Sequence, residues 1–95
     1  MSTDEQAAVT FNTFILSLVT TAAVHFGDIA PPGSDTRLEP DLAGAAQMIE
    51  ILGMLQQKTE GNLAPDEQRF LEQVLYELRM RYVEAAKHEK RIIQP

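Results

Sequence analysis

Residues of the types that do chemistry are few in this sequence, and none of them forms a complete catalytic set. The two histidines, His25 and His88, fall near the ends of different predicted helices and have no convergent partner residues. Glu84 and His88 are four residues apart and could both reach one cation, but two ligands do not make a metal site, and a surface ion pair is the simpler interpretation. Cysteine is absent, which excludes thiol nucleophiles, thiolate metal ligands and disulfides. The sequence therefore predicts no enzyme, no cofactor and no metal site.

One group of polar residues could do more than support the fold. Four of its members lie where one apolar-periodic segment ends and a longer one begins, and two lie further along the second segment. The group consists of Lys58, Thr59, Gly61, Asn62, Arg79 and Tyr82. Lys58 and Thr59 would satisfy free carbonyl groups at a helix end, and Asn62 could cap the next helix. Arg79 and Tyr82 share one side of a helix, some way from the turn. Structural roles explain the whole group, and a binding role is the alternative, because Arg beside Tyr is typical of interface hot spots.

The turn between these two segments has clear helix stop and start signals. Gly61 can take the left-handed conformation that closes a helix, and Pro65 suits the first turn of the next one. Asp66 and Glu67 then place negative charge beside the exposed amides of that helix. The pattern predicts an antiparallel helical hairpin, with helices over about 41–58 and about 65–90 and a turn over 59–64.

A resemblance to a known family appears at the same turn. The residues Lys58-Thr59-x-Gly61-Asn62-Leu63, followed by Leu75-Tyr76-x-Leu78-Arg79-x-x-Tyr82, resemble the bacterial family catalogued as domain of unknown function 1844. The likeness extends upstream through Phe14-Ile15-Leu16-Ser17-Leu18 and covers roughly residues 11–85. It implies a small, soluble, helical protein with no assigned reaction. The chain departs from the family pattern at Ala64, whose side chain cannot cap a helix, at a cost of roughly 1 kcal/mol.

The first predicted helix, over about residues 5–26, has an unusual composition. From Gln6 to Gly27 it contains no Asp, Glu, Lys or Arg, and apolar residues occur on nearly all of its sides. A helix of this kind is expected to be buried on nearly all sides, and two short partner helices can cover only part of it. The surplus predicts self-association, with these candidate interface residues: Phe11, Phe14, Ile15, Leu18, Val19, Ala22 and Phe26.

The same helix allows a second interpretation. Its length reaches the minimum for a membrane span, but seven polar residues lie between Val9 and Phe26, so we expect no stable insertion. A peripheral membrane or lipid-binding protein that uses this uncharged helix is the alternative function.

The middle of the chain combines a long connection with two unusual glycines. Residues 27–40 include Pro31, Pro32 and Gly33 and are predicted to be a passive crossover loop rather than a lid. Gly44 and Gly53 lie inside the second helix, where each costs up to about 1 kcal/mol relative to Ala. Close backbone approach by another helix would offset that cost.

Composition completes the prediction. The chain of 95 residues shows no compositional break, so we expect a single domain over 1–95. The net charge of −6 counts against nucleic acid as a partner, and the acidic N-terminus is unlike a signal peptide, so a cytoplasmic location is expected.

The predicted fold is all-α: a long first helix, a crossover loop and a hairpin. The predicted function is a non-enzymatic interaction module whose partner is itself, as a homodimer or higher oligomer, with another cytoplasmic protein as a further partner.

Overall fold

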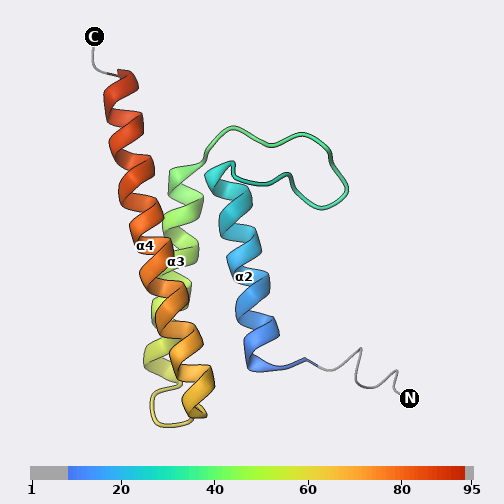
Figure 1. The fold of residues 1–95 in the computed structure, drawn as a ribbon, viewed down its shortest axis with the longest axis vertical. Coiled ribbons are helices and arrows are strands. Elements are labelled where there is room, and N and C mark those ends of the chain that lie inside the picture. The colour runs from blue at the N-terminus through green and yellow to red at the C-terminus, as the bar shows by residue number, and fades with distance from the viewer. Residues whose placement is uncertain (1–8, 94–95) are drawn as a thin grey trace.

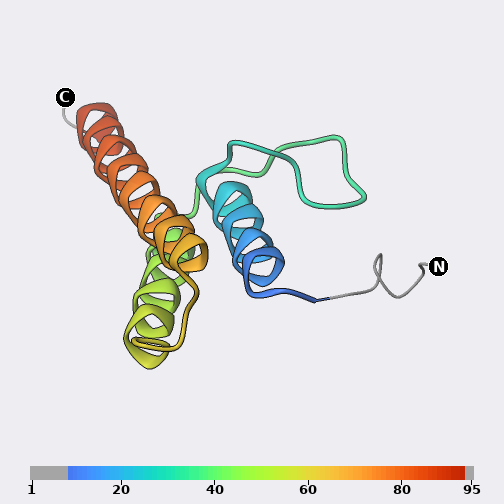
Figure 2. The same cartoon turned by 60° about the horizontal axis from the view of Figure 1, so that its bottom comes forward.

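The computed structural model describes the backbone of residues 9–93 and the side chains as far as His88. This part of the chain holds three α-helices and no β-strand, which confirms the predicted all-α class. The helices are α2 (Phe11–Phe26), α3 (Leu42–Lys58) and α4 (Pro65–Ile93). A long loop joins α2 to α3, a short turn joins α3 to α4, and the C-terminal turns of α4 extend past the other two helices (Figure 1). Figure 2 shows that α3 and α4 cross at an angle, with α2 beside them.

Two threonines define the start of α2. The Thr13 amide donates to Thr10 Oγ1 at 3.0 Å, and the Thr10 amide donates to Thr13 Oγ1 at 2.9 Å. This reciprocal capping box makes Thr10 the N-cap, so the helix begins at Phe11 rather than near residue 5. Val9 and Thr10 are not helical, and residues 5–8 of the predicted helix lie outside the described part of the chain.

The end of α2 is a complete Schellman motif. Gly27 has a φ of 81°, its amide donates to Val24 O at 3.0 Å, and the Asp28 amide donates to Ala23 O at 2.9 Å. Glycine suits this position because the left-handed conformation is strained for residues that carry a Cβ. The predicted stop at Gly27 is confirmed.

The other two helices begin and end close to the predicted positions. Asp41 is the N-cap of α3, because its Oδ1 accepts from the Gly44 amide at 3.0 Å. At the start of α4 the Ala64 amide donates to Glu67 Oε1 at 2.8 Å. This is one half of a capping box; the other half is missing because Ala64 has no side-chain acceptor. Gly61, with a φ of 83°, has the left-handed conformation that the sequence predicted.

A small core lies where the three helices meet. All three helices contribute to it: Ile15, Ala22 and Phe26 from α2, Ala45, Met48 and Leu52 from α3, and Leu71, Val74, Leu75 and Leu78 from α4. Among the described residues no polar or charged side chain is buried in this core. Burial of these apolar groups is the main force that holds α2 against the other two helices.

The two helical glycines differ in their surroundings. A Cβ on Gly44 would lie 2.6 Å from His25 Nδ1 and 2.7 Å from Asp41 Oδ2, so the side chain of His25 in α2 fills the space that glycine leaves. The sequence predicted close approach by the backbone of another helix, whereas the neighbour found here is a side chain of α2. A Cβ on Gly53 would meet only Arg79 Nη2, at an ordinary contact distance of 3.6 Å. Among the described residues, none therefore offsets the cost of glycine at position 53.

Candidate functional site

The seven α2 residues predicted to face a second copy are divided by the fold. Ile15, Ala22 and Phe26 are almost completely buried in the chain's own core and are not available to a partner. Phe11, Leu18 and Val19 are half-buried against that core, and Phe14 remains 44% exposed. The sequence predicted these interface candidates on a helix that is apolar on nearly all sides, whereas the fold uses one side of the helix internally and leaves a different side open.

That open side, the α2 outer face, is formed by Thr13, Phe14, Leu16, Ser17, Thr20 and Thr21. No residue of α2 is an acid, a lysine or an arginine, so the face carries no charge. The hydroxyl groups of Ser17, Thr20 and Thr21 donate to carbonyl oxygens one turn back in the same helix, at 2.7, 3.1 and 3.1 Å. Because these donors are already bonded, covering the face with another apolar surface leaves none of them unsatisfied.

The predicted polar group is not brought together as one site. Lys58, Thr59, Gly61 and Asn62 lie at the α3–α4 turn, where Thr59 Oγ1 donates to Leu55 O at 2.7 Å and the Asn62 amide donates to Thr59 O at 2.8 Å. Arg79 and Tyr82 are far along α4, because a helix rises 1.5 Å per residue and position 79 is therefore about 20 Å from Pro65. Thr59 and Asn62 thus have structural contacts within the turn.

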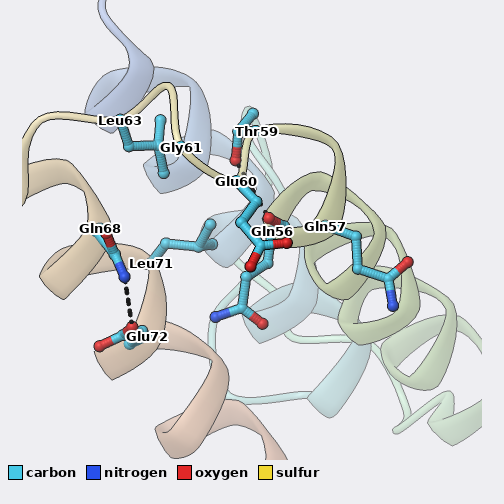
Figure 3. A pocket seen from close by; sticks show the side chains of 9 residues that line it. All are labelled: Gln56, Gln57, Thr59, Glu60, Gly61, Leu63, Gln68, Leu71 and Glu72. Carbon is cyan, nitrogen blue, oxygen red and sulfur yellow. Dashed lines mark hydrogen bonds between the residues drawn. The ribbon is translucent and has the colours of Figure 1, made fainter.

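A shallow pocket of about 260 Å³ lies beside the same turn. It is lined from the end of α3, the turn and the start of α4 by Gln56, Gln57, Thr59, Glu60, Gly61, Leu63, Gln68, Leu71 and Glu72 (Figure 3). Gln68 Nε2 donates to Glu72 Oε2 at 3.2 Å, and Leu71 is the buried apolar residue of the lining. The pocket is smaller than the usual 300–1,000 Å³ of small-molecule sites. Its amides and carboxylates form no arrangement that we can assign to a reaction.

The residues with metal-binding side chains are also dispersed. In the part of the chain that the structure describes, no group of three or more His, Cys, Asp or Glu residues could hold a metal ion. His25 Nδ1 lies 3.5 Å from Asp41 Oδ2, and His88 is exposed on the projecting part of α4.

A long-range ion pair is the feature that sequence reasoning missed. Arg81 Nε and Nη2 donate to the two carboxylate oxygens of Asp28 at 2.9 and 2.7 Å, and its guanidinium lies 5.0 Å above the ring of Phe26. The hydrogen bonds between Arg81 and Asp28 lower the pKa of Asp28 below its ordinary value of 3.8 and raise the pKa of Arg81 above its ordinary value. The two residues are 53 positions apart, so no local spacing signals the pair.

Comparison with known proteins places the chain in a family. The family model described as a domain of unknown function, DUF1844, matches residues 8–84. The chain belongs to this family. The match spans α2, α3 and most of α4, including the loop and the turn, and confirms the resemblance found in the sequence. No curated protein and no solved structure matches the chain significantly. The family description assigns no reaction, ligand or partner.

The described helices do not meet the requirements of a membrane span. Within residues 9–93, none of them combines the length and the apolar character that crossing a bilayer needs.

Proposed function

We propose that this protein is a non-enzymatic, cytoplasmic interaction module that assembles with copies of itself, as a homodimer or higher oligomer, through the α2 outer face. The observation that supports the proposal is the chemistry of this face. It combines exposed Phe14 and Leu16 with Thr and Ser side chains whose hydroxyl donors are bonded within the helix.

The proposal rests on a comparison of solvation costs. Charged side chains are expensive to remove from water, whereas an uncharged face that keeps its internal hydrogen bonds loses little on desolvation. Small residues such as Ser17 and Thr20 also permit a second helix to come close, which increases dispersion contacts. A helix face with neither charge nor unsatisfied donors is therefore better suited to contact with protein than to contact with solvent.

The test is to add one charge at the centre of this face. In Thr20→Arg an exposed residue becomes a long cation, which a close helix–helix contact would have to bury without a partner. We expect the oligomer's dissociation constant to rise by at least about tenfold, measured by sedimentation equilibrium. Gln57→Arg is the matched control, because it adds the same charge at an exposed position near the end of α3.

Two results would contradict the proposal. The first is a wild-type chain that remains monomeric at micromolar concentration. The second is an oligomer whose mass and affinity are the same in wild type, Thr20→Arg and Gln57→Arg. Circular dichroism on each variant separates loss of assembly from loss of folding, and Thr20→Arg is expected to retain the wild-type helix content because Thr20 is outside the core.

The alternative function is peripheral membrane or lipid binding through the same face. Exposed Phe14 and Leu16 on this face, with exposed Val9 just before α2, favour this candidate, since an uncharged, partly apolar surface can also enter the lipid headgroup region. Deeper insertion would require α2 to leave the other helices and to withdraw Ile15, Ala22 and Phe26 from the core. Net acidic charge disfavours anionic lipid.

Vesicle flotation distinguishes the two functions. Under the oligomer proposal the protein stays in the bottom fraction with both neutral and anionic vesicles. Co-flotation with neutral vesicles that Thr20→Arg abolishes and Gln57→Arg preserves would favour the membrane function instead.

A further inference from the structure

The polar contacts that hold α2 against the rest of the chain are concentrated at one of its ends. At the loop end, where α2 stops and α3 starts, the Asp41 amide donates to His25 O at 2.6 Å. At the same end Arg81 donates to both carboxylate oxygens of Asp28. Among the described residues, no hydrogen bond or ion pair joins residues 11–24 of α2 to α3 or α4. Of the described contacts, apolar packing alone therefore holds this longer part of the helix.

The N-terminal half of α2 has few such packing contacts. Among residues 11–18, Ile15 is the only one that is completely buried, and Phe11 is half-buried against the core. A helix rises 1.5 Å per residue, so Ile15 lies about 15 Å along α2 from His25, too far for the contacts at the loop end to hold it. Both Figure 1 and Figure 2 show α2 farther from α3 here than at the loop end. The N-terminal half is therefore the less firmly held part of α2.

A buried polar atom without a partner lies in this same half. Asn12 Oδ1 is buried, and no donor in the described part of the chain forms a hydrogen bond with it. Successive helical residues are about 100° apart, so Asn12 lies within roughly 20° of Val19 and 60° of Ile15, on the side that packs against the core. A buried carbonyl oxygen that accepts no hydrogen bond destabilises the packed position of α2 relative to one in which water reaches it.

We infer that α2 is a hinged element, whose N-terminal half swings away from α3 and α4 while the contacts of His25 and Asp28 hold its C-terminal end. The swing brings Asn12 Oδ1 into water and uncovers Ile15, and it loses only the apolar contacts of the first turns of the helix. The partial opening is therefore easier than global unfolding, which must also break the contacts at the loop end.

The hinge changes the apolar surface that the chain presents. In the closed position Phe14 is 44% exposed and Ile15 is completely buried. In the open position Phe11 and Ile15 join Phe14, on a helix that contains no acid, lysine or arginine. The swing thus regulates how much uncharged apolar surface is available for contact. It does not rest on the proposed oligomer, because it concerns the side of α2 that faces the core.

Cysteine labelling tests the hinge, because the chain has no cysteine of its own. Ile15→Cys and Ala22→Cys each place one thiol at a completely buried position, the first in the N-terminal half and the second near the loop end. The rate of reaction with a maleimide is compared with the rate that the variant's own global unfolding, measured in urea, allows. We expect position 15 to react at least about tenfold faster than that limit and position 22 to match it. Labelling of both positions at their global limits would overturn the hinge.

Two further substitutions separate the parts of the hinge. Asn12→Val removes the buried amide and keeps nearly the same helix preference, so in the Ile15→Cys chain it is expected to slow labelling about tenfold. Gln47→Leu is the control, because it replaces an exposed amide of α3 with an apolar residue of similar helix preference and should leave the rate unchanged. Equal rates in these two variants would show that the buried oxygen does not favour opening, and would reject the hinge in the form inferred.

Asp28→Asn weakens the contacts about which α2 turns. It is expected to speed labelling at position 22 about twofold and to leave position 15 unchanged, because the swing keeps the Asp28–Arg81 pair intact. Acceleration at position 15 alone would contradict a hinge at the loop end.

Methyl relaxation dispersion on the unsubstituted chain is a second measurement that requires no change in the core. Hinge motions fall in the microsecond-to-millisecond range, so we expect exchange broadening at the Ile15 methyl groups and none at the Ala22 methyl group. Absence of exchange at Ile15, or equal exchange at both residues, would overturn the hinge even if Ile15→Cys fails to fold.

Discussion

The three helices are joined at their two ends by different kinds of contact. At the loop end, where α2 stops and α3 starts, the contacts join residues far apart in the chain: Arg81 holds Asp28, and the Asp41 amide donates to His25 O at 2.6 Å. At the turn end, between α3 and α4, the hydrogen bonds are local and join residues within four positions of each other, such as Asn62 to Thr59 and Ala64 to Glu67.

This difference decides how each end responds to substitution. A local turn depends on the backbone preferences of its own residues, which are worth about 1 kcal/mol each. The loop end depends in addition on contacts between helices, so a substitution there disturbs several elements at once. Four substitution experiments at these two ends and in the helices between them would test the comparison, from the largest expected effect to the smallest.

The first experiment compares Gly27→Ala with Gly61→Ala. Both glycines have left-handed backbone, with φ values of 81° and 83°, so alanine costs about 1 kcal/mol at either position. A Cβ on Gly27 would also lie 3.1 Å from Leu38 O, whereas a Cβ on Gly61 would meet nothing within 4 Å. We expect urea unfolding to show a loss of about 2 kcal/mol for Gly27→Ala and about 1 kcal/mol for Gly61→Ala. Equal losses in the free energy of unfolding would show that contacts at the loop end add nothing to the cost of the left-handed backbone.

The second experiment compares the two glycines inside α3. Gly53→Ala is expected to raise the free energy of unfolding by up to about 1 kcal/mol, because alanine is the better helix former and the site has space. Gly44→Ala is expected to lower it by about 1 kcal/mol despite the same helix preference, since the new methyl group must displace His25 and Asp41. In a His25→Ala background the loss at position 44 should shrink. A stabilising Gly44→Ala would contradict the close contact.

The third experiment completes the half-formed cap at the turn end. Ala64→Ser supplies a hydroxyl acceptor for the free amides of the first turn of α4, which Glu67 cannot reach while it accepts from the Ala64 amide. The expected result is a gain of about 1 kcal/mol in the free energy of unfolding, with Ala64→Val as a control that cannot cap. If serine and valine behave alike, the missing cap does not limit stability.

The smallest effect concerns pH and the loop end. Because folding lowers the pKa of Asp28, the Asp28–Arg81 pair contributes its full stability above the ordinary pKa of 3.8 and loses it as pH falls through the lower folded-state value. Both side chains are more than a third exposed, so the contribution is about 0.5 kcal/mol. The free energies of unfolding of wild type and Asp28→Asn should therefore differ at pH 7 and converge in acid. A difference in the free energy of unfolding that persists in acid would show that the substitution acts through something other than the Asp28–Arg81 pair.

The sequence predicted the three-helix, all-α fold and most helix ends because those depend on local signals. Gly27, Gly61 and Pro65 mark stops and starts through their own backbone preferences, and Asp41 marks a start through its capping side chain. The start of α2 was predicted too early, since the apolar pattern continues upstream of the Thr10–Thr13 capping box, which is the stronger signal.

The candidate site was less accessible to sequence reasoning. Periodicity shows that α2 is apolar on several sides, but only packing decides that Ile15, Ala22 and Phe26 are used within the chain while Phe14 and Leu16 remain outside. The Asp28–Arg81 pair depends on how the loop and α4 meet in space, and that meeting has no counterpart in local spacing. The family match adds no site.

The loop between α2 and α3 also offers a practical use. Gly33 lies at an open turn, with the Ser34 amide donating to Pro31 O at 3.1 Å and nothing within 4 Å of where a Cβ would be. Both ends of the loop are held, at Asp28 by Arg81 and at Asp41 by His25 O, so extra chain length would be confined between two anchors. Each doubling of loop length costs only about 0.6 kcal/mol of closure entropy. An epitope tag or a fluorescent reporter inserted after Gly33 would therefore label the protein internally, leaving the helices and the proposed interface in place.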